Sequence, residues 1–299
     1  MSLSLQARFW RMLFRMIFKN RRMTIAENRA LNARNGQLMN RIPSQARVEK
    51  FEIEGSPAAW IRPPRVEGNR VLVHFHGGGY VTGSIDGHLM MCIPLAQTLS
   101  MNLLLPEYRL APEHPFPAAL EDALKAYRWL LAQGYAPERI LLSGDSAGGG
   151  LALATVLSLR EAGDPLPAAL VLVSPWTDLR LQGGSHVTRA QADAVLHPDV
   201  LREWALCYAG EANPDNPLVS PLLADFHGFP PLLIQVGSDE ILLDDALGLA
   251  RKAAADGVPV TLRVWPGLWH VWQMVGEFIP ESRKAFEEIR SFLKATDRA

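Results

Sequence analysis

The sequence predicts an α/β fold in which a mostly parallel, eight-stranded sheet is covered by helices on both faces. Short apolar runs that are typical of strands alternate with longer helical segments along most of the 299 residues. Only the first two runs follow each other closely enough to form an antiparallel hairpin. The hydrophobic fraction of 48% and the charged fraction of 20% are ordinary for a globular protein.

The predicted strands are bounded by turn residues. The first two form a hairpin at a sheet edge, joined by Glu54-Gly55-Ser56-Pro57. The eight strands span residues 47–53, 58–62, 70–76, 102–105, 139–143, 169–174, 232–236 and 260–265. Helices that connect and follow them span residues 88–99, 117–132, 150–161, 244–256 and 280–295.

Two segments have no strand to belong to, and we expect both to lie over the strand ends as a helical cap. Residues 1–45 are predicted as N-terminal cap helices, and residues 181–221 as a cap insertion that includes a helix over 199–208. The sheet and its helices are then divided between residues 46–180 and residues 222–299.

The first twenty-three residues have the pattern of an amphipathic helix. Apolar and basic residues recur at steps of three and four, namely Phe9, Trp10, Leu13, Phe14, Ile17 and Phe18 against Arg8, Arg11, Arg15, Lys19 and Arg22. The pattern favours a helix whose apolar face packs on the protein; contact with an anionic membrane surface is the alternative. Because arginines interrupt every apolar run, we expect no transmembrane segment, no signal peptide and a cytoplasmic protein.

Composition excludes several partners. The formal net charge is -1, so nothing indicates binding to nucleic acid. The two cysteines, Cys92 and Cys207, are interpreted as buried thiols in a reducing compartment. His74 and His76 share a strand face but lack a third ligand at recognisable spacing, so we expect no metal and no other cofactor.

The most informative motif follows the predicted strand over 139–143. Gly144-Asp145-Ser146-Ala147-Gly148 fits the G-x-S-x-G turn that lifts a serine out of a sheet and places it at a helix N-terminus. Glycine is needed where a Cβ would clash with the strand or the helix. A plain Gly-Ser loop or a phosphate cradle would give the same local pattern.

Other segments support the catalytic interpretation. The chain order is Ser146, an acid after the strand ending at Val236, and then His270. Together these segments resemble the hormone-sensitive-lipase-like esterases, bacterial family IV of the α/β-hydrolase fold. The residues that carry the resemblance are His76-Gly77-Gly78-Gly79-Tyr80, the segment from Tyr108 to Ala119, and Gly144 to Gly149.

The resemblance implies an α/β-hydrolase core with a helical cap that cleaves carboxylic esters without a cofactor. It implies Ser146 as nucleophile, His270 as base, and the amides of Gly78, Gly79 and Ala147 as oxyanion hole. His76, Gly77 and Asp145 would support these motifs, and the segment from Tyr108 to Ala119 is interpreted as a structural brace.

Two neighbouring carboxylates compete for the role of the acid. In the family the acid opens an Asp-x-Leu-x-Asp pattern, three residues after a glycine that ends the strand. Counting from Gly237 leads to Glu240, and Glu240-Ile241-Leu242-Leu243-Asp244 keeps the leucine and the final aspartate in place. We therefore predict Glu240 as the acid, with Asp239 as the alternative.

The predicted activity is that of a serine carboxylesterase acting through an acyl-enzyme on small or medium esters with short acyl chains. A lactone or N-acyl hydrolase would use the same triad. A ligand-binding receptor on this fold is the non-enzyme alternative, although the known plant example lacks the histidine that His270 supplies here. The strand over 260–265 would be an exposed edge through which two copies could pair.

Overall fold

All eight predicted strands are present in the computed structural model, which describes residues 3–19, 23–39 and 45–296. Most boundaries lie within two residues of the predicted ones. The strands are β1 (Arg47–Ile53), β2 (Ser56–Arg62), β3 (Val71–Phe75), β4 (Asn102–Pro106), β5 (Ile140–Asp145), β6 (Ala169–Val173), β7 (Leu232–Gly237) and β8 (Val260–Trp265).

The strands form one sheet in the order β1-β2-β4-β3-β5-β6-β7-β8. β1 and β2 pair antiparallel, as predicted, and β2 also runs antiparallel to β4. The pairs from β4 through β3 to β8 are all parallel. The carboxyl ends of these strands therefore share one edge of the sheet, where open α/β sheets place their ligands.

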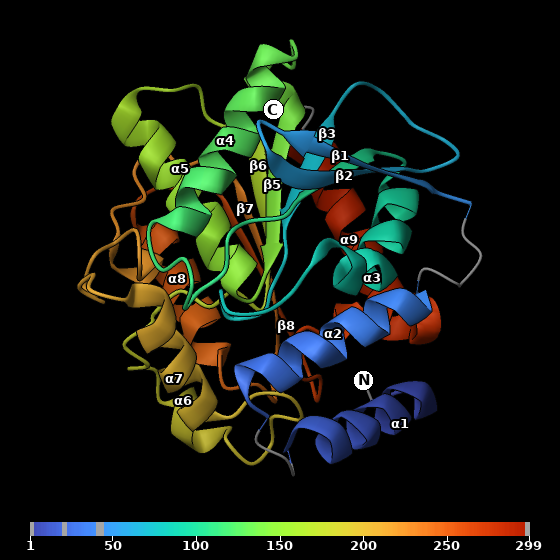
Figure 1. Cartoon of the computed structure of the whole chain (residues 1–299), viewed down its shortest axis with the longest axis vertical. Helices are drawn as coiled ribbons and strands as arrows, with labels where there is room; N and C mark the ends of the chain where they lie inside the picture. Colours follow the sequence, from blue (N-terminus) through green and yellow to red (C-terminus); the bar gives the residue numbers. More distant parts are fainter. Residues whose placement is uncertain (1–2, 20–22, 40–44, 297–299) are drawn as a thin grey trace.

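Two helical layers cover the sheet. The helices α4 (Ala118–Ala132), α5 (Ala147–Ala162) and α8 (Leu243–Ala255) cover one face, and α3 (Ile85–Leu99) and α9 (Pro280–Thr296) cover the other (Figure 1). Alternate residues of β3 divide between the layers: Val71, Val73 and Phe75 pack on the α4–α5–α8 side and Leu72 on the other. This burial on both faces is why most residues of the central strands are apolar.

Helix α5 begins at Ala147, earlier than the predicted residue 150. The prediction began late because glycine disfavours a helix interior, and three glycines follow Ala147. In the structure, a Cβ on Gly148 would collide with the carbonyl oxygen of Phe75, and one on Gly150 with that of Trp176. Close packing of the first helical turn on neighbouring backbone therefore requires these glycines.

The N-terminal segment differs in part from its prediction. Helix α1 (Leu5–Phe14) passes into a π-helical turn, η1 (Arg15–Lys19), and α2 (Ile25–Met39) follows; residues 20–22 lie outside the described residues. Trp10 and Phe14 face the protein as expected. The placement of Phe9 on the packed face was wrong, because one residue turns a helix by 100° and the Phe9 side chain is exposed.

The insertion folds into two helices, α6 (Ser185–Thr188) and α7 (Pro198–Ala209), the second close to the prediction over 199–208. Figure 1 shows α1, α2, α6 and α7 together in the lower part of the molecule, with α1 as the outermost element. Among the helices that the structure describes, none has both the length and the apolar character needed to span a bilayer.

Candidate active site

Ser146 stands at the turn between β5 and α5. Its backbone has φ 54° and ψ −122°, an unusual conformation for a residue with a side chain. The turn is held by the Ser146 N–H, which donates to the Val173 carbonyl oxygen at 2.9 Å. A Cβ on Gly144 would collide with the carbonyl oxygen of Gly148, so the two glycines of the motif permit the turn. The strand–turn–helix arrangement predicted from the motif is therefore present.

The glycine loop after β3 lies beside this turn. Gly78 and Gly79 have φ values of 121° and 61°, which residues with side chains rarely adopt. The Gly77 N–H donates to Asp145 Oδ1 at 2.9 Å. This contact ties the loop directly to the residue before Ser146.

Histidines surround the Asp145 carboxylate. His74 Nε2 lies 3.1 Å from Asp145 Oδ1, and His88 Nε2 lies 3.4 Å from the same oxygen. Burial acts to raise the pKa of Asp145, but the His88 charge and the hydrogen bonds from both histidines outweigh it and lower the pKa. The carboxylate therefore stays ionised and can accept the Gly77 N–H.

Tyr108 braces the loop from the other side, as expected for a structural segment. Its hydroxyl donates to the carbonyl oxygen of His76 at 2.6 Å, and its ring stacks on the His76 imidazole with centroids 4.1 Å apart. Burial lowers the pKa of His76 to about 3, so this imidazole is neutral. A buried, neutral His76 that stacks on Tyr108 fits the expected role of shaping the loop.

His270 and Glu240 meet on the loops that follow β8 and β7. His270 Nδ1–H donates to Glu240 Oε2 at 2.8 Å, and both side chains are buried. The other carboxylate oxygen of Glu240 accepts the Ser174 hydroxyl at 2.9 Å and the Gly237 N–H. Ser174 Oγ in turn accepts the Val271 N–H at 3.2 Å. Three hydrogen bonds thus hold the Glu240 carboxylate in place, one from His270 itself and one from Ser174, which also contacts the histidine loop.

The electrostatics of this pair favour a positive charge on the imidazole. Burial acts to lower the pKa of His270, but the hydrogen bond and charge of Glu240, with Asp193 and Asp145 contributing, outweigh it and raise the pKa. For Glu240, burial raises the pKa and the interaction with His270 opposes it.

Asp239, the alternative acid, is engaged elsewhere. Its Oδ2 forms an ion pair with Arg11 of α1 at 2.7 Å, and its Oδ1 accepts the Ser238 hydroxyl at 2.9 Å. Adjacent residues on the loop after β7 point in different directions, so only one of the two carboxylates meets the imidazole. In the structure that residue is Glu240.

Ser146, His270 and the glycine loop share one cavity of about 450 Å³, within the range of small-molecule sites. Further walls come from α1, η1, residues 23–32 and the segment that leads into and includes α7. The residues lining it from these elements are Trp10, Leu13, Phe14, Ile17, Phe18, Met23, Asn28, Leu31, Asn32, Val195, Leu196, His197, Val200 and Trp204. The N-terminal segment thus supplies much of the apolar lining of the cavity that contains Ser146.

Comparison with known proteins agrees with this geometry. A family model described as alpha/beta hydrolase fold matches residues 72–274, more than half of the chain. The chain belongs to this family. The α/β hydrolase is also 47% identical to an acetyl-hydrolase of Streptomyces hygroscopicus over 79% of each chain. It is 36% identical to an esterase of Acinetobacter venetianus, over 81% of this chain and 84% of that protein.

Similarity to a solved structure identifies a narrower group of α/β hydrolases to which the chain belongs. A crystal structure of an esterase from the bacterial hormone-sensitive lipase family is 42% identical, with a TM-score of 0.93 over 99% of both chains. The resemblance drawn from the sequence motifs is therefore confirmed, and this α/β hydrolase is a carboxylic ester hydrolase of that family.

Sequence reasoning missed two groups of this α/β hydrolase near the site. His88 belongs to no sequence motif, but it is buried, lines the cavity and lies 3.2 Å from the Gly77 nitrogen. Asp193 carried no motif, yet it is fully buried and its Oδ2 accepts the Ile241 N–H at 2.9 Å beside Glu240. Only the fold brings either residue to the site.

Proposed function

We propose that Ser146 is the nucleophile, His270 the general base and Glu240 the acid that orients it. The buried hydrogen bond between His270 and Glu240, at the wall of a cavity that also contains Ser146, carries this proposal. Three N–H groups, those of Gly78, Gly79 and Ala147, would form the oxyanion hole. Ala147 begins α5, and the first N–H groups of a helix have no partner within it.

The reaction then proceeds in two halves. Ser146 Oγ attacks the ester carbonyl carbon while His270 Nε2 takes the hydroxyl proton, and the Glu240 carboxylate stabilises the imidazolium that forms. The tetrahedral oxyanion is stabilised by the amides, each typically worth about 10²–10³ in turnover. Collapse expels the alcohol, which receives the proton from His270, and leaves an acyl group on Ser146. A water molecule then attacks the acyl carbonyl while His270 takes its proton. The bond to Ser146 Oγ breaks, Oγ receives that proton from His270, and the carboxylic acid is released.

We propose that the N-terminal helices and residues 181–221 act as a cap that sets the acyl length. Support comes from the cavity that contains Ser146, because part of its lining belongs to α1, η1, α2 and the segment leading into α7. Its volume of about 450 Å³ suits small or medium esters. The name of the acetyl-hydrolase relative agrees with a short acyl group.

The experiment is a hydrolysis profile with p-nitrophenyl esters from acetate to palmitate, together with a lactone and an anilide. We expect kcat/KM to be highest between acetate and hexanoate and to fall for longer chains, because a cavity of about 450 Å³ limits the room for the acyl chain. A variant lacking residues 1–22 is expected to lose this preference, since it lacks one wall. Highest activity on palmitate would contradict the proposal, and faster lactone or anilide cleavage would favour the lactone or N-acyl hydrolase instead.

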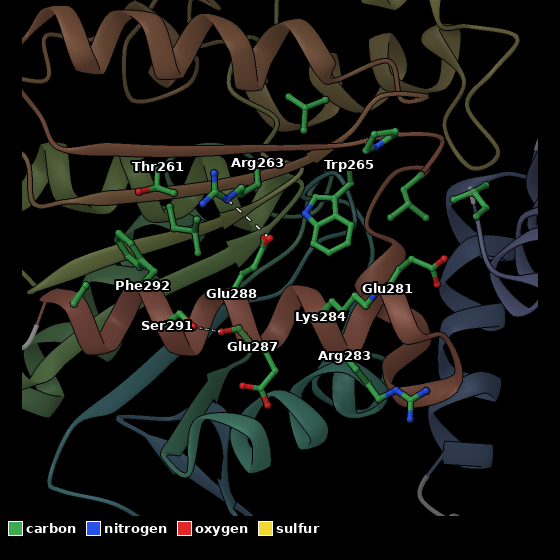
Figure 2. A pocket seen from close by; sticks show the side chains of 16 residues that line it. Thr261, Arg263, Trp265, Glu281, Arg283, Lys284, Glu287, Glu288, Ser291 and Phe292 are labelled. Atoms are coloured by element: carbon green, nitrogen blue, oxygen red, sulfur yellow. Dashed lines mark hydrogen bonds and ion pairs between the residues drawn. The ribbon is translucent and has the colours of Figure 1, made fainter. Parts of the chain in front are cut away.

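We also propose that two copies pair through β8. This strand ends the sheet, so one side of its backbone has no neighbouring strand among the described residues. Figure 2 shows the groove of about 930 Å³ that lies between β8 and α9, with Thr261, Arg263 and Trp265 opposite Glu288 and Phe292. An unpaired edge next to an open groove favours a twofold strand pairing.

The dimer is tested by sedimentation equilibrium. The native chain is expected to sediment at twice the monomer mass, and Val264→Lys, which places a charge on the strand edge, as a monomer. Val66→Lys is the matched control, because Val66 and Val264 are both 41% exposed and Val66 lies in the loop between β2 and β3. A native chain that remains monomeric at micromolar concentration would rule out this pairing.

A further inference from the structure

Helix α1 and η1 present two apolar faces, although packing on the protein needs only one. The inner face packs: the Trp10 ring lies 6.0 Å from that of Phe278, and the Phe14 ring 5.8 Å from that of Trp269. Trp10 and Phe14 also line the cavity that contains Ser146. The packed inner face accounts for the role of the segment as a cap.

The opposite face is exposed. Leu5, Phe9, Met12 and Met16, which we call the outer stripe, are 78%, 56%, 55% and 62% exposed. Their spacing of four, three and four residues places them within one narrow arc of the helix. Single exposed apolar residues need no explanation, but four aligned ones are characteristic of an interaction surface. Within the described part of the chain the packing of the segment does not depend on this stripe, because those contacts are made from the other side of the helix.

The charge around the stripe indicates what covers it. Residues 1–39 contain eight of the 30 lysines and arginines of the chain but one of its 31 aspartates and glutamates. Three of the basic residues anchor the segment by donating to backbone carbonyl oxygens: Arg11 to that of Gly267, Arg15 to that of Gln191 and Lys19 to that of Leu196. Arg8 and Arg34 are exposed. A second copy of the same face would bring two positive segments together, whereas an anionic surface is complementary.

We infer that the outer stripe docks α1 on an anionic lipid surface, with its apolar side chains in the interface and the basic residues on the headgroups. The inner face of the same helix lines the cavity of Ser146. The docked segment would therefore hold the cavity wall next to the lipid. This inference goes beyond ester hydrolysis, and its test measures binding to lipid vesicles, which does not depend on catalytic activity.

The experiment is co-flotation of the full chain with vesicles. Binding is expected to vesicles of phosphatidylcholine with about 30 mol% phosphatidylglycerol, to be weak with phosphatidylcholine alone, and to decrease in about 0.5 M NaCl. The variant Leu5→Ser/Met12→Ser/Met16→Ser is expected to bind at least about tenfold more weakly. Its hydrolysis of p-nitrophenyl acetate should remain near the native rate, because these side chains do not line the cavity.

The matched control carries the same change at exposed apolar residues of other elements, Val66→Ser/Val187→Ser/Leu206→Ser. This variant is expected to bind vesicles like the native chain. Three results would each overturn the inference: no binding of the native chain to the anionic vesicles, equal loss in both triple variants, or a native oligomer that dissociates only in the stripe variant. The last would show that a second copy covers the stripe. Ser146→Ala is expected to bind the vesicles like the native chain. Binding to lipid can then be judged separately from the proposed catalytic mechanism.

Discussion

Replacing Ser146 by alanine is expected to lower kcat for p-nitrophenyl acetate by about 10⁴–10⁶ while the chain stays folded. The methyl group offers no oxygen to attack the carbonyl carbon, and His270 and Glu240 then have no nucleophile to activate. Because triad members act as a unit, losing the nucleophile removes nearly all of their combined effect. The residual rate would come from binding and from the amides of the oxyanion hole.

Two measurements check this expectation. Steady-state hydrolysis gives the loss of turnover, and a fluorophosphonate probe followed by peptide mass spectrometry should label the native chain once, at Ser146. Ser158→Ala is the control, because Ser158 lies on the same helix α5 and outside the cavity. Turnover of Ser146→Ala near the native rate, or labelling at another serine, would contradict the mechanism.

A paired substitution of the two neighbouring acids is expected to separate their roles. Glu240→Gln should lower kcat by about 10³–10⁴, because the amide cannot stabilise the imidazolium and can present its NH₂ group to His270 Nδ1, favouring the wrong tautomer. Asp239→Asn removes only a partly exposed ion pair with Arg11, an interaction typically worth about 0–1 kcal/mol. Its kcat should stay within about threefold of the native value.

The pH dependence supplies a second measurement on the same pair. In the proposed mechanism His270 must be neutral to accept the Ser146 proton, so activity is expected to be lost as pH falls through the pKa of His270. Since the Glu240 carboxylate contributes to raising that pKa, Glu240→Gln is expected to move the acidic limb of kcat/KM to lower pH. Asp239→Asn should leave the limb unchanged. A large loss in Asp239→Asn with a mild effect in Glu240→Gln would overturn the proposed roles.

The sequence alone determined the class of fold and the motifs around the site. Apolar runs with short bounding turns predicted all eight strands, because such a run is a local pattern that depends on neighbouring residues only. Gly144, Gly148 and the glycines after His76 could be recognised for the same reason: the turn that each permits is local. The preference for Glu240 over Asp239 came from spacing within one loop, and the structure brings Glu240 to His270.

Only the tertiary structure decided which side chains meet across long stretches of chain. Asp193 reaches the loop of Glu240 from the segment between β6 and β7, and Arg11 reaches Asp239 from the N-terminal helix. Nor could periodicity place Phe9, because apolar residues occupy most of the circumference of α1 and any arc of it could have faced the core. Whether a side chain is buried depends on the elements that surround it. Which face of α1 is buried is therefore decided by its packing partners, here the loops beside His270 and Glu240.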